Sequence, residues 1–594
     1  MTESKAAHDA LCVNTIRALS MDMVQGANSG HPGAPMGLAP AAYVLWTRHL
    51  KHDPSEPHWA DRDRFVLSAG HASALLYSLL HLTGYDLDLE DLKGFRQWGS
   101  RTPGHPEFGM TPGVETTTGP LGQGIATAVG MAMAEKMLAS RFNAAGHRVV
   151  DHRVWGICSD GDLMEGISHE AASLAGHLKL GNLNFIYDNN HITIDGRTDI
   201  SFSEDVAKRF ESYGWHTLHV DDGTDLEAIA SALSACAAET SRPSLVLVRT
   251  HIAEGAPTKE DTSGAHGAPL GVDEIAAWRS SVGWPDEDYH VPEEALAVFR
   301  SCIDRGSAAH AEWAERFTDW AKAEPELATE WDRRISGRLP ALDLPVIEGE
   351  KLATRKATAK TLAALAQQMP ELAGGSADLA ESNGAALGTE AAFSADAPGR
   401  YIHWGVREHA MGAAVNGITL HGGMRAYSAT FLIFSDYMRP AIRLASLMEI
   451  PSVFLFSHDS VALGEDGPTH QPIEQLMSLR AIPGLNVIRP ADANETVEAW
   501  RAALQRLDGP TLVVVTRQDL PIVDRSVMAG ADGLHRGAYT LIEYGPEKPA
   551  PEVILIATGS EVSVAVTAAE ALGARGIRTR VVSMPGWELF AQQP

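Results

Sequence analysis

Short apolar runs that end in polar residues recur along this chain and predict buried strands. The runs 154–158 and 183–187 are both followed by acidic and amide residues, and apolar residues recur between them at helical spacing over 167–178. This order predicts a β-α-β unit with parallel strands. Similar runs at 453–456 and 512–515, each ending in polar residues, predict strands in a second region.

Between these two α/β-like regions lies a polar, proline-bearing stretch that is typical of a linker. A third region shows only two strand-like runs and one helical stretch, which is too little to close a sheet, so we expect it to be truncated. The predicted fold class is α/β, with three consecutive domains of mostly parallel sheets flanked by helices. The predicted boundaries are 1–320, a linker at 321–351, 352–530, and a truncated C-terminal domain at 537–594.

Composition excludes several classes of function. The 594 residues carry a net charge of −28, which disfavours nucleic acids and anionic membranes as partners. The four cysteines have no metal-site spacing, and no apolar run is long enough for a secretory leader or a membrane span. We therefore expect a cytoplasmic protein. Because the net negative charge repels anions, any site for a phosphate-bearing ligand needs its own cluster of Arg and His.

Polar residues follow the two strands of the first β-α-β unit. Asp160 and Asn190 are predicted to lie side by side, because parallel neighbouring strands end at the same edge of a sheet. A carboxylate, an amide oxygen and a nearby carbonyl suit Mg²⁺, and Gly161 allows phosphates to approach the backbone. The alternative is that Asp160 caps a helix and Asn190 makes a turn.

Five histidines lie beside glycine or in turns, where an imidazole is kept out of a regular core. They are His31, His71, His105, His266 and His470. Each alone is best explained as a satisfied loop histidine. Together they favour a site that exchanges protons with hydroxyls and carbonyls.

The second region carries candidates with equally ordinary alternatives. Glu408 begins an apolar helix, where a negative charge is favourable in itself. The stretch containing Phe431, Phe434 and Tyr437, if helical, places aromatic residues three apart, which is typical of core packing. Arg517 follows a strand, where a guanidinium can grip a phosphate.

Asp160-Gly161, followed about thirty residues later by Asn189-Asn190, resembles the thiamine diphosphate signature of the transketolase family. The resemblance extends through 62–68 and 266–270 and covers nearly the whole chain. Departures fall at Ser159, where the family usually has Gly, at Ala69, where it commonly has Asn, and at 252–255, where Ile-Gly-aromatic-Gly is usual.

The resemblance implies thiamine diphosphate together with Mg²⁺, Ca²⁺ or Mn²⁺, and it implies a role for each matching residue. The implied metal ligands are Asp160, Asn190 and the carbonyl of Ile192. The implied cofactor-binding residues are His71, Gly119, Leu121, Asp160, Gly161, Asn190, Ile194, His266, Asp378, Glu408, Phe431, Phe434 and Tyr437. The implied substrate-binding residues are His31, Arg355, Ser382, His458, Asp466, His470 and Arg517. The implied catalytic residues are Glu408, His470, His266, His71, His105 and His31.

By the same resemblance, the chain would transfer a two-carbon ketol unit from a ketose phosphate such as xylulose 5-phosphate to an aldose phosphate such as ribose 5-phosphate, through the cofactor carbanion. This is a reaction of the pentose phosphate pathway, and the family implies a homodimer with its sites at the subunit interface. Two alternatives remain open, a related synthase for dihydroxyacetone or deoxyxylulose phosphate, and a non-catalytic relative. The retained Glu408, Asp160, Asn190 and five histidines argue against the latter.

Overall fold

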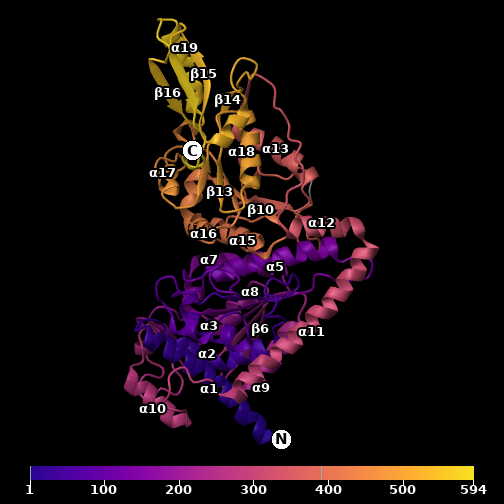
Figure 1. Ribbon diagram of the computed structural model, residues 1–594, viewed down its shortest axis with the longest axis vertical. Helices are drawn as coiled ribbons and strands as arrows, with labels where there is room; N and C mark the ends of the chain where they lie inside the picture. The colour runs from indigo at the N-terminus through magenta and orange to yellow at the C-terminus, as the bar shows by residue number, and fades with distance from the viewer. Residues whose placement is uncertain (1, 389–390) are drawn as a thin grey trace. The chain divides into compact units, whose positions relative to one another are not determined.

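The computed structural model describes residues 2–388 and 391–594 and divides into two compact units, one ending at Ala328 and the other beginning at Thr329 (Figure 1). Both units are built on mostly parallel sheets flanked by helices, as the sequence predicts. Each buries apolar side chains of its own.

The first unit is organised around one parallel five-stranded sheet. Its order is β1-β2-β3-β7-β6, with β1 at Arg64–Leu67, β2 at Val154–Ser159, β3 at Leu183–Asp188, β7 at Ser244–Val248 and β6 at His216–Val220. Every residue of the first four is buried, which explains their continuous apolar runs. The edge strand β6 is only partly buried.

Helices cover this sheet and supply the first and last segments of the unit (Figure 1). They are α1 (Thr2–Gly26), α2 (Gly33–Val44), α3 (Ser73–Thr83), α4 (Leu89–Lys93), α5 (Gln123–Phe142), α6 (Asp160–Met164), α7 (Gly166–His177), α8 (Val206–Ser212), α9 (Leu226–Ala238), α10 (Val272–Val282) and α11 (Glu293–Ala323). A small ribbon of β4 (Ile192–Thr193) and β5 (Gly196–Arg197) lies between β3 and α8.

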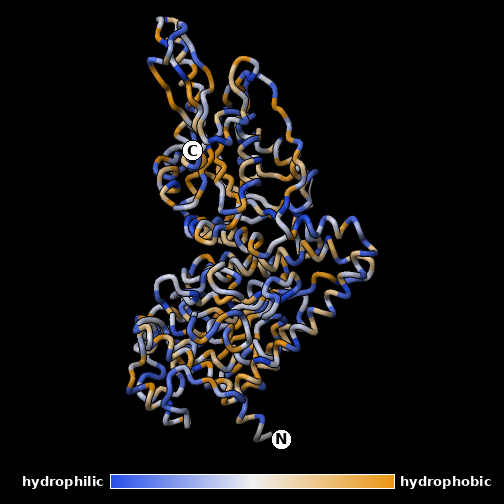
Figure 2. Tube along the Cα trace, in the orientation of Figure 1, coloured by the Kyte–Doolittle hydropathy of each residue, from blue (hydrophilic) through white to orange (hydrophobic). Residues whose placement is uncertain are grey.

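The long helix α11 shows how sequence pattern sets packing. Hydrophilic and hydrophobic residues alternate along its tube (Figure 2), and Ala295, Phe299, Cys302 and Gly306 recur every three or four residues on its buried side. A side chain at Gly306 would meet the carbonyl oxygen of His52 at 2.1 Å, so only glycine allows this close approach.

The second unit contains another parallel five-stranded sheet. Its order is β12-β13-β11-β10-β9, with β12 at Asn486–Ile488, β13 at Thr511–Val514, β11 at Val453–Ser457, β10 at Arg425–Phe431 and β9 at Leu372–Ser376. The associated elements are α13 (Thr354–Gln368), α14 (Ala380–Asn383), α15 (Glu408–His421), α16 (Ser435–Leu447), α17 (Gln475–Arg480), α18 (Ala493–Gln505) and the antiparallel pair β8 (Lys351–Ala353) and β14 (Asp519–Pro521).

The C-terminal region forms a three-stranded sheet in the order β15-β17-β16. The two predicted strands are β16 (Val553–Ala557) and β17 (Thr579–Ser583), which pair in parallel around α19 (Glu561–Gly573). The expectation of only two strands and one helix was wrong. β15 (Tyr539–Tyr544) adds an antiparallel strand, and α20 (Trp587–Ala591) follows β17.

A buried charge network ties this small sheet to the larger sheet of the same unit. Arg489, just beyond β12, lies 2.6 Å from the carboxylate of Asp459 and donates a hydrogen bond to the carbonyl of Thr558 at 3.0 Å. It also pairs with Glu561 at the start of α19. Because a buried cation needs such partners, the network fixes where α19 begins.

The stretch predicted as a linker, 321–351, contains the helix α12 (Pro325–Ile335) and then no further element before β8. Within the described residues, none of the helices combines the length and the apolar character that crossing a bilayer requires.

Candidate active site

Asp160 and Asn190 lie where two neighbouring strands of the first unit end. β2 and β3 are parallel, with Ser159 opposite Asp188, so both chains leave the sheet at the same edge. The Tyr187 hydroxyl donates a hydrogen bond to Oδ1 of Asp160, whereas Oδ2 is buried with no hydrogen-bond partner among the described residues. This orphaned oxygen points to a cation ligand.

The environment of Asp160 is unfavourable for an uncompensated carboxylate. Burial raises its pKa to about 7, although the Tyr187 hydroxyl and the His191 amide lower it. A polar cavity of about 360 Å³ opens beside it and is lined in part by Asn189, His191 and Arg197. A bound divalent cation would hold this carboxylate in its charged form.

Of the two structural alternatives for this pair, one is wrong and one is right. Ser159, not Asp160, is the N-cap of α6. Asn190 does make a turn, because its Oδ1 accepts a hydrogen bond from the Ile192 amide at 2.8 Å. Its amide nitrogen donates to Asp188 Oδ2 at 2.8 Å, which directs Oδ1 toward the loop that carries Ile192.

Asp162 organises the surrounding loops, and sequence reasoning did not single it out as a site residue. Its buried carboxylate accepts hydrogen bonds from the Ser68 hydroxyl at 2.7 Å, the Gly122 amide at 2.8 Å and the Ser159 amide at 2.9 Å. It thereby joins the ends of β1 and β2 to residues 119–122, the glycine loop, which directly precede α5. Only its position two residues after Asp160 could have drawn attention to it.

The glycine loop lies close to His105. At Gly119, where φ is +132°, a Cβ would meet the His105 ring at 3.2 Å. At Gly161 a Cβ would meet Leu121 at 2.8 Å. These residues therefore line one continuous surface at the carboxyl edge of the sheet.

Four of the five predicted histidines form one cluster in the first unit. His31 lies 5.2 Å from His71, 6.4 Å from His105 and 5.7 Å from His266, ring centroid to ring centroid. His71 and His266 are stacked at 5.2 Å. A side chain at Gly267 would lie 3.3 Å from Ile194 and 3.4 Å from His31, so Ile194 borders the same cluster.

The cluster is electrically neutral near pH 7. Burial, together with the neighbouring His266, Arg96 and His105, lowers the pKa of His31 to about 4. Burial also lowers the pKa of His71 well below its usual value, and that of His105 and His266. Neutral imidazoles can both donate and accept hydrogen bonds, as hydroxyl and carbonyl ligands require.

In the second unit, Glu408 is the first residue of α15, as predicted, and it is half-buried. Burial raises the pKa of its carboxyl group above the ordinary value. The side chain of Thr430, near the end of β10, interacts with this carboxyl group and opposes part of that rise in pKa. Asp378, just beyond β9, adopts a left-handed backbone with φ +59°.

The aromatic stretch is not one helix. Phe431 ends β10, Phe434 lies in a 3₁₀ turn, and Tyr437 lies in α16. The Phe431 and Phe434 rings are stacked at 5.9 Å, and Phe434 lies 5.4 Å from His470. Phe431 is buried and Tyr437 is exposed, so the three rings run from the core to the surface.

The residues implied to bind the substrate phosphate also lie in the second unit, at or near the ends of its elements. His458 follows β11 and stacks on Phe431 at 3.7 Å. Arg517 follows β13 and donates to the Leu463 carbonyl at 3.1 Å, while Arg355, in the first turn of α13, donates to the Ser382 carbonyl at 2.7 Å.

The carboxylate of Asp466 lies 3.8 Å from His458 Nε2 and 3.9 Å from Arg517 Nε. Burial lowers the pKa of His458 to about 4, and Arg355 and Arg517 lower it despite Asp466.

Asn383 is a second organising residue that sequence reasoning missed. Its Nδ2 donates to the Ser376 hydroxyl at 2.8 Å, and its Oδ1 accepts from the Ser457 hydroxyl at 2.7 Å. It thus joins the ends of β9 and β11, next to Ser382 and His458. A single buried amide at the end of a short helix has no distinctive sequence signal.

Positions at which the chain departs from the family's usual sequence lie in the first unit. Ala69 is buried directly after β1. Ala253 is buried with φ +54°, and Glu254 forms an ion pair of 2.9 Å with Arg17.

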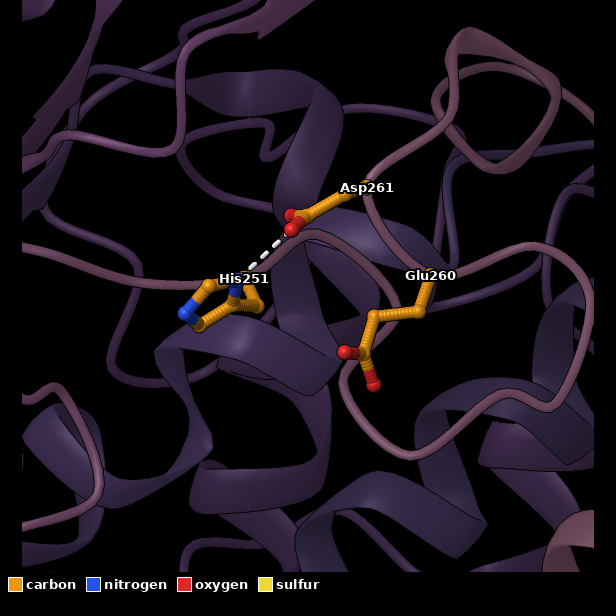
Figure 3. Close-up of side chains that lie close together, drawn as sticks. All are labelled: His251, Glu260 and Asp261. Carbon is orange, nitrogen blue, oxygen red and sulfur yellow. Dashed lines mark hydrogen bonds and ion pairs between the residues drawn. The ribbon is translucent and has the colours of Figure 1, made fainter.

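His251, Glu260 and Asp261 form another group whose ligand atoms lie within 4.8 Å of one another (Figure 3). His251 Nδ1 lies 2.7 Å from Asp261 Oδ2, and Glu260 accepts from the Gly255 amide at 2.6 Å. Both carboxylates are exposed, so this group lacks the buried, orphaned oxygen that marks Asp160.

Two parallel α/β sheets with polar clusters at their carboxyl edges define a ligand-binding α/β enzyme. Family models match three segments: the transketolase thiamine diphosphate binding domain over residues 8–340, the transketolase pyrimidine binding domain over 350–523 and a transketolase-like C-terminal domain over 537–594. The chain belongs to the transketolase family.

Comparison with individual relatives leads to the same family. A transketolase of Geobacillus stearothermophilus is 54% identical over 99% of this chain and 88% of its own length, and one of Bacillus subtilis is 51% identical over 98% and 88%. The structure of a Pichia stipitis transketolase in complex with sedoheptulose 7-phosphate is 44% identical, with a TM-score of 0.96 over 99% of this chain and 88% of that one. A Leishmania mexicana transketolase is 45% identical, with a TM-score of 0.95 over 98% and 87%. The chain is accordingly an enzyme of the transketolase type.

Proposed function

We propose that this enzyme transfers a two-carbon ketol unit from xylulose 5-phosphate to ribose 5-phosphate, using thiamine diphosphate and a divalent cation such as Mg²⁺. The observation that carries the proposal is the buried Oδ2 of Asp160, which has no hydrogen-bond partner among the described residues, together with the glycine loop and the cluster of neutral histidines. The oxygen donors suit Mg²⁺, and the glycine loop suits a diphosphate.

Asp160, Asn190 and the Ile192 carbonyl would hold the cation, and Gly119, Leu121 and Gly161 would lie against the diphosphate. Bound thiamine diphosphate supplies a nucleophilic carbon, which the protein itself lacks. Glu408 would hold a proton at the aminopyrimidine, a task that its raised pKa favours. Phe431, Phe434, Tyr437 and Asp378 would line the pyrimidine pocket.

The neutral His31, His71, His105 and His266 would bind and orient the hydroxyls around the breaking C2–C3 bond of the ketose. Asp466 and His470 would bind the hydroxyl end of the substrate. Arg355, Ser382, His458 and Arg517 would bind its phosphate, because a guanidinium pair matches a dianion in charge and geometry.

A coupled assay of ketol transfer to ribose 5-phosphate, with and without added cofactor and Mg²⁺, tests the proposal. We expect turnover only when both are present. Turnover with pyruvate in place of xylulose 5-phosphate would instead indicate a deoxyxylulose phosphate synthase, and turnover with formaldehyde in place of ribose 5-phosphate would indicate a dihydroxyacetone synthase. Binding of cofactor and Mg²⁺ with no turnover on any sugar would indicate a non-catalytic relative.

We also propose that the enzyme is a homodimer whose sites combine Asp160 of one chain with Glu408 of the other. Mixing inactive Asp160→Ala and Glu408→Ala chains, after dissociation and reassembly, would then restore about a quarter of the activity, since half the dimers are mixed and each has one intact site. No recovery, with mixed dimers shown to form, would place both residues of a site on one chain.

A further inference from the structure

Arg517, which is proposed to bind the substrate phosphate, already holds an anion of the protein itself. Its Nη2 is in direct contact with Oε1 of Glu465, and its Nη1 donates to the carbonyl of Leu463, two residues before Glu465. The carboxylate of Glu465 therefore occupies the guanidinium edge that a phosphate would use.

A second arginine, Arg355, lies near Arg517, and the carboxylate of Asp466 lies 3.9 Å from Arg517 Nε. Arg355 has a buried Nε without a hydrogen-bond partner among the described residues. Burial lowers the pKa of Arg355, and the like charge of the nearby Arg517 also lowers it. His458 also lies near Asp466.

The ion pair between Glu465 and Arg517 can open at a small cost in free energy. Its side chain is 73% exposed, so water can solvate the carboxylate once the ion pair opens. It lies between Gly464, with φ +86°, and Gly467, with φ +76°, two positions at which the backbone is freer than at other residues. Arg517 is the ion-pair partner that the structure gives this carboxylate.

We propose that Glu465 is a tethered competitor for the phosphate subsite and sets its selectivity for dianionic phosphate esters. A phosphate dianion can pair with both guanidinium groups and displaces the single charge of Glu465, whereas a monoanion gains too little to do so. The inference rests on the proposed function only in taking the substrate to be a phosphate ester.

Glu465→Gln tests the inference because it removes the charge and keeps the shape. Binding of inorganic phosphate, measured by calorimetry without turnover, should tighten by about two- to five-fold, which is the effect of losing one exposed ion pair. KM for ribose 5-phosphate should fall by a similar factor, while KM for the unphosphorylated glycolaldehyde should not change. The matched control is Glu547→Gln, which removes one negative charge from an exposed loop of the same unit.

Arg517→Ala and the double variant Arg517→Ala with Glu465→Gln should bind phosphate equally weakly, because Glu465 acts through Arg517. Weaker phosphate binding in Glu465→Gln would overturn the inference and make Glu465 a residue that positions Arg517. Equal tightening in Glu547→Gln would reduce the effect to net charge and overturn it as well. Absence of ketol transfer in every variant would overturn the proposed function, and the phosphate-binding ratio would still test Glu465.

Discussion

The two polar clusters of this enzyme differ in how the charges of their side chains are set. In the first unit, three imidazoles lie within 6.4 Å of the His31 ring and burial keeps the cluster neutral, and the buried Oδ2 of Asp160 has no hydrogen-bond partner among the described residues. In the second unit, Arg517 and His458 are close to carboxylates on an exposed loop. Burial therefore sets the charge state of the first cluster, whereas the ion pair of Arg517 in the second lies where water can solvate it.

The largest effect is expected at Asp160, because one oxygen of this buried carboxylate has no hydrogen-bond partner among the described residues. Asp160→Ala should abolish Mg²⁺-dependent binding of thiamine diphosphate and reduce activity by at least about 100-fold. Titration of the cofactor at several Mg²⁺ concentrations checks this. Asp195→Asn, in an exposed turn nearby, is the control and should bind the cofactor normally. Unchanged Mg²⁺ dependence in Asp160→Ala would remove Asp160 from the metal site.

Glu408→Ala should produce the next largest effect and separate binding from chemistry. We expect kcat to fall by about 10²–10⁴-fold, the range for losing a positioned proton-transfer group, while the cofactor Kd changes only a few-fold. Deuterium exchange at the thiazolium C2 of the bound cofactor should slow in parallel with kcat. Exchange at the wild-type rate would contradict the role given to Glu408.

Arg517→Ala should distinguish the second cluster from the neutral one. KM for ribose 5-phosphate is expected to rise by about 10-fold or more, because a charge-assisted contact to phosphate is lost, whereas KM for glycolaldehyde should stay within about two-fold. Arg536→Ala, an exposed arginine of the same unit, is the control. Equal increases for both substrates would exclude Arg517 from phosphate binding.

The sequence was sufficient to predict the edges at which these clusters lie, but not their internal connections. Fully buried parallel strands leave continuous apolar runs, so the ends of β2, β3, β11 and β13 could be located, and with them Asp160 and Arg517. The stretch from Phe431 to Tyr437 was harder, because a strand end, a turn and a helix start within seven residues leave no period to detect.

The organising residues Asp162 and Asn383 illustrate the other limit. Each is a single buried polar side chain whose partners come from loops far apart in sequence, so its role depends on tertiary contacts that no local pattern encodes. Strand β15 was missed for a related reason. It pairs antiparallel at the edge of its sheet and is only partly buried, so its residues show no continuous apolar run.

The smallest expected effect is the acid sensitivity of the neutral cluster. Because the pKa of His31 is lowered to about 4 in the folded protein, the unfolded chain binds more protons between pH 6.5 and 4. Folding is therefore destabilised progressively as pH falls from 6.5, and the loss levels off below about pH 4. His31→Asn, which cannot take up the proton, should reduce the drop in Tm between pH 7 and pH 5 by roughly 1 to 3 °C. Thermal unfolding of the cofactor-free enzyme at both pH values measures this, with His8→Asn, an exposed histidine of α1, as the control. An identical drop in wild type and His31→Asn would show that His31 is not held neutral, and the contrast between the two clusters would then rest on geometry alone.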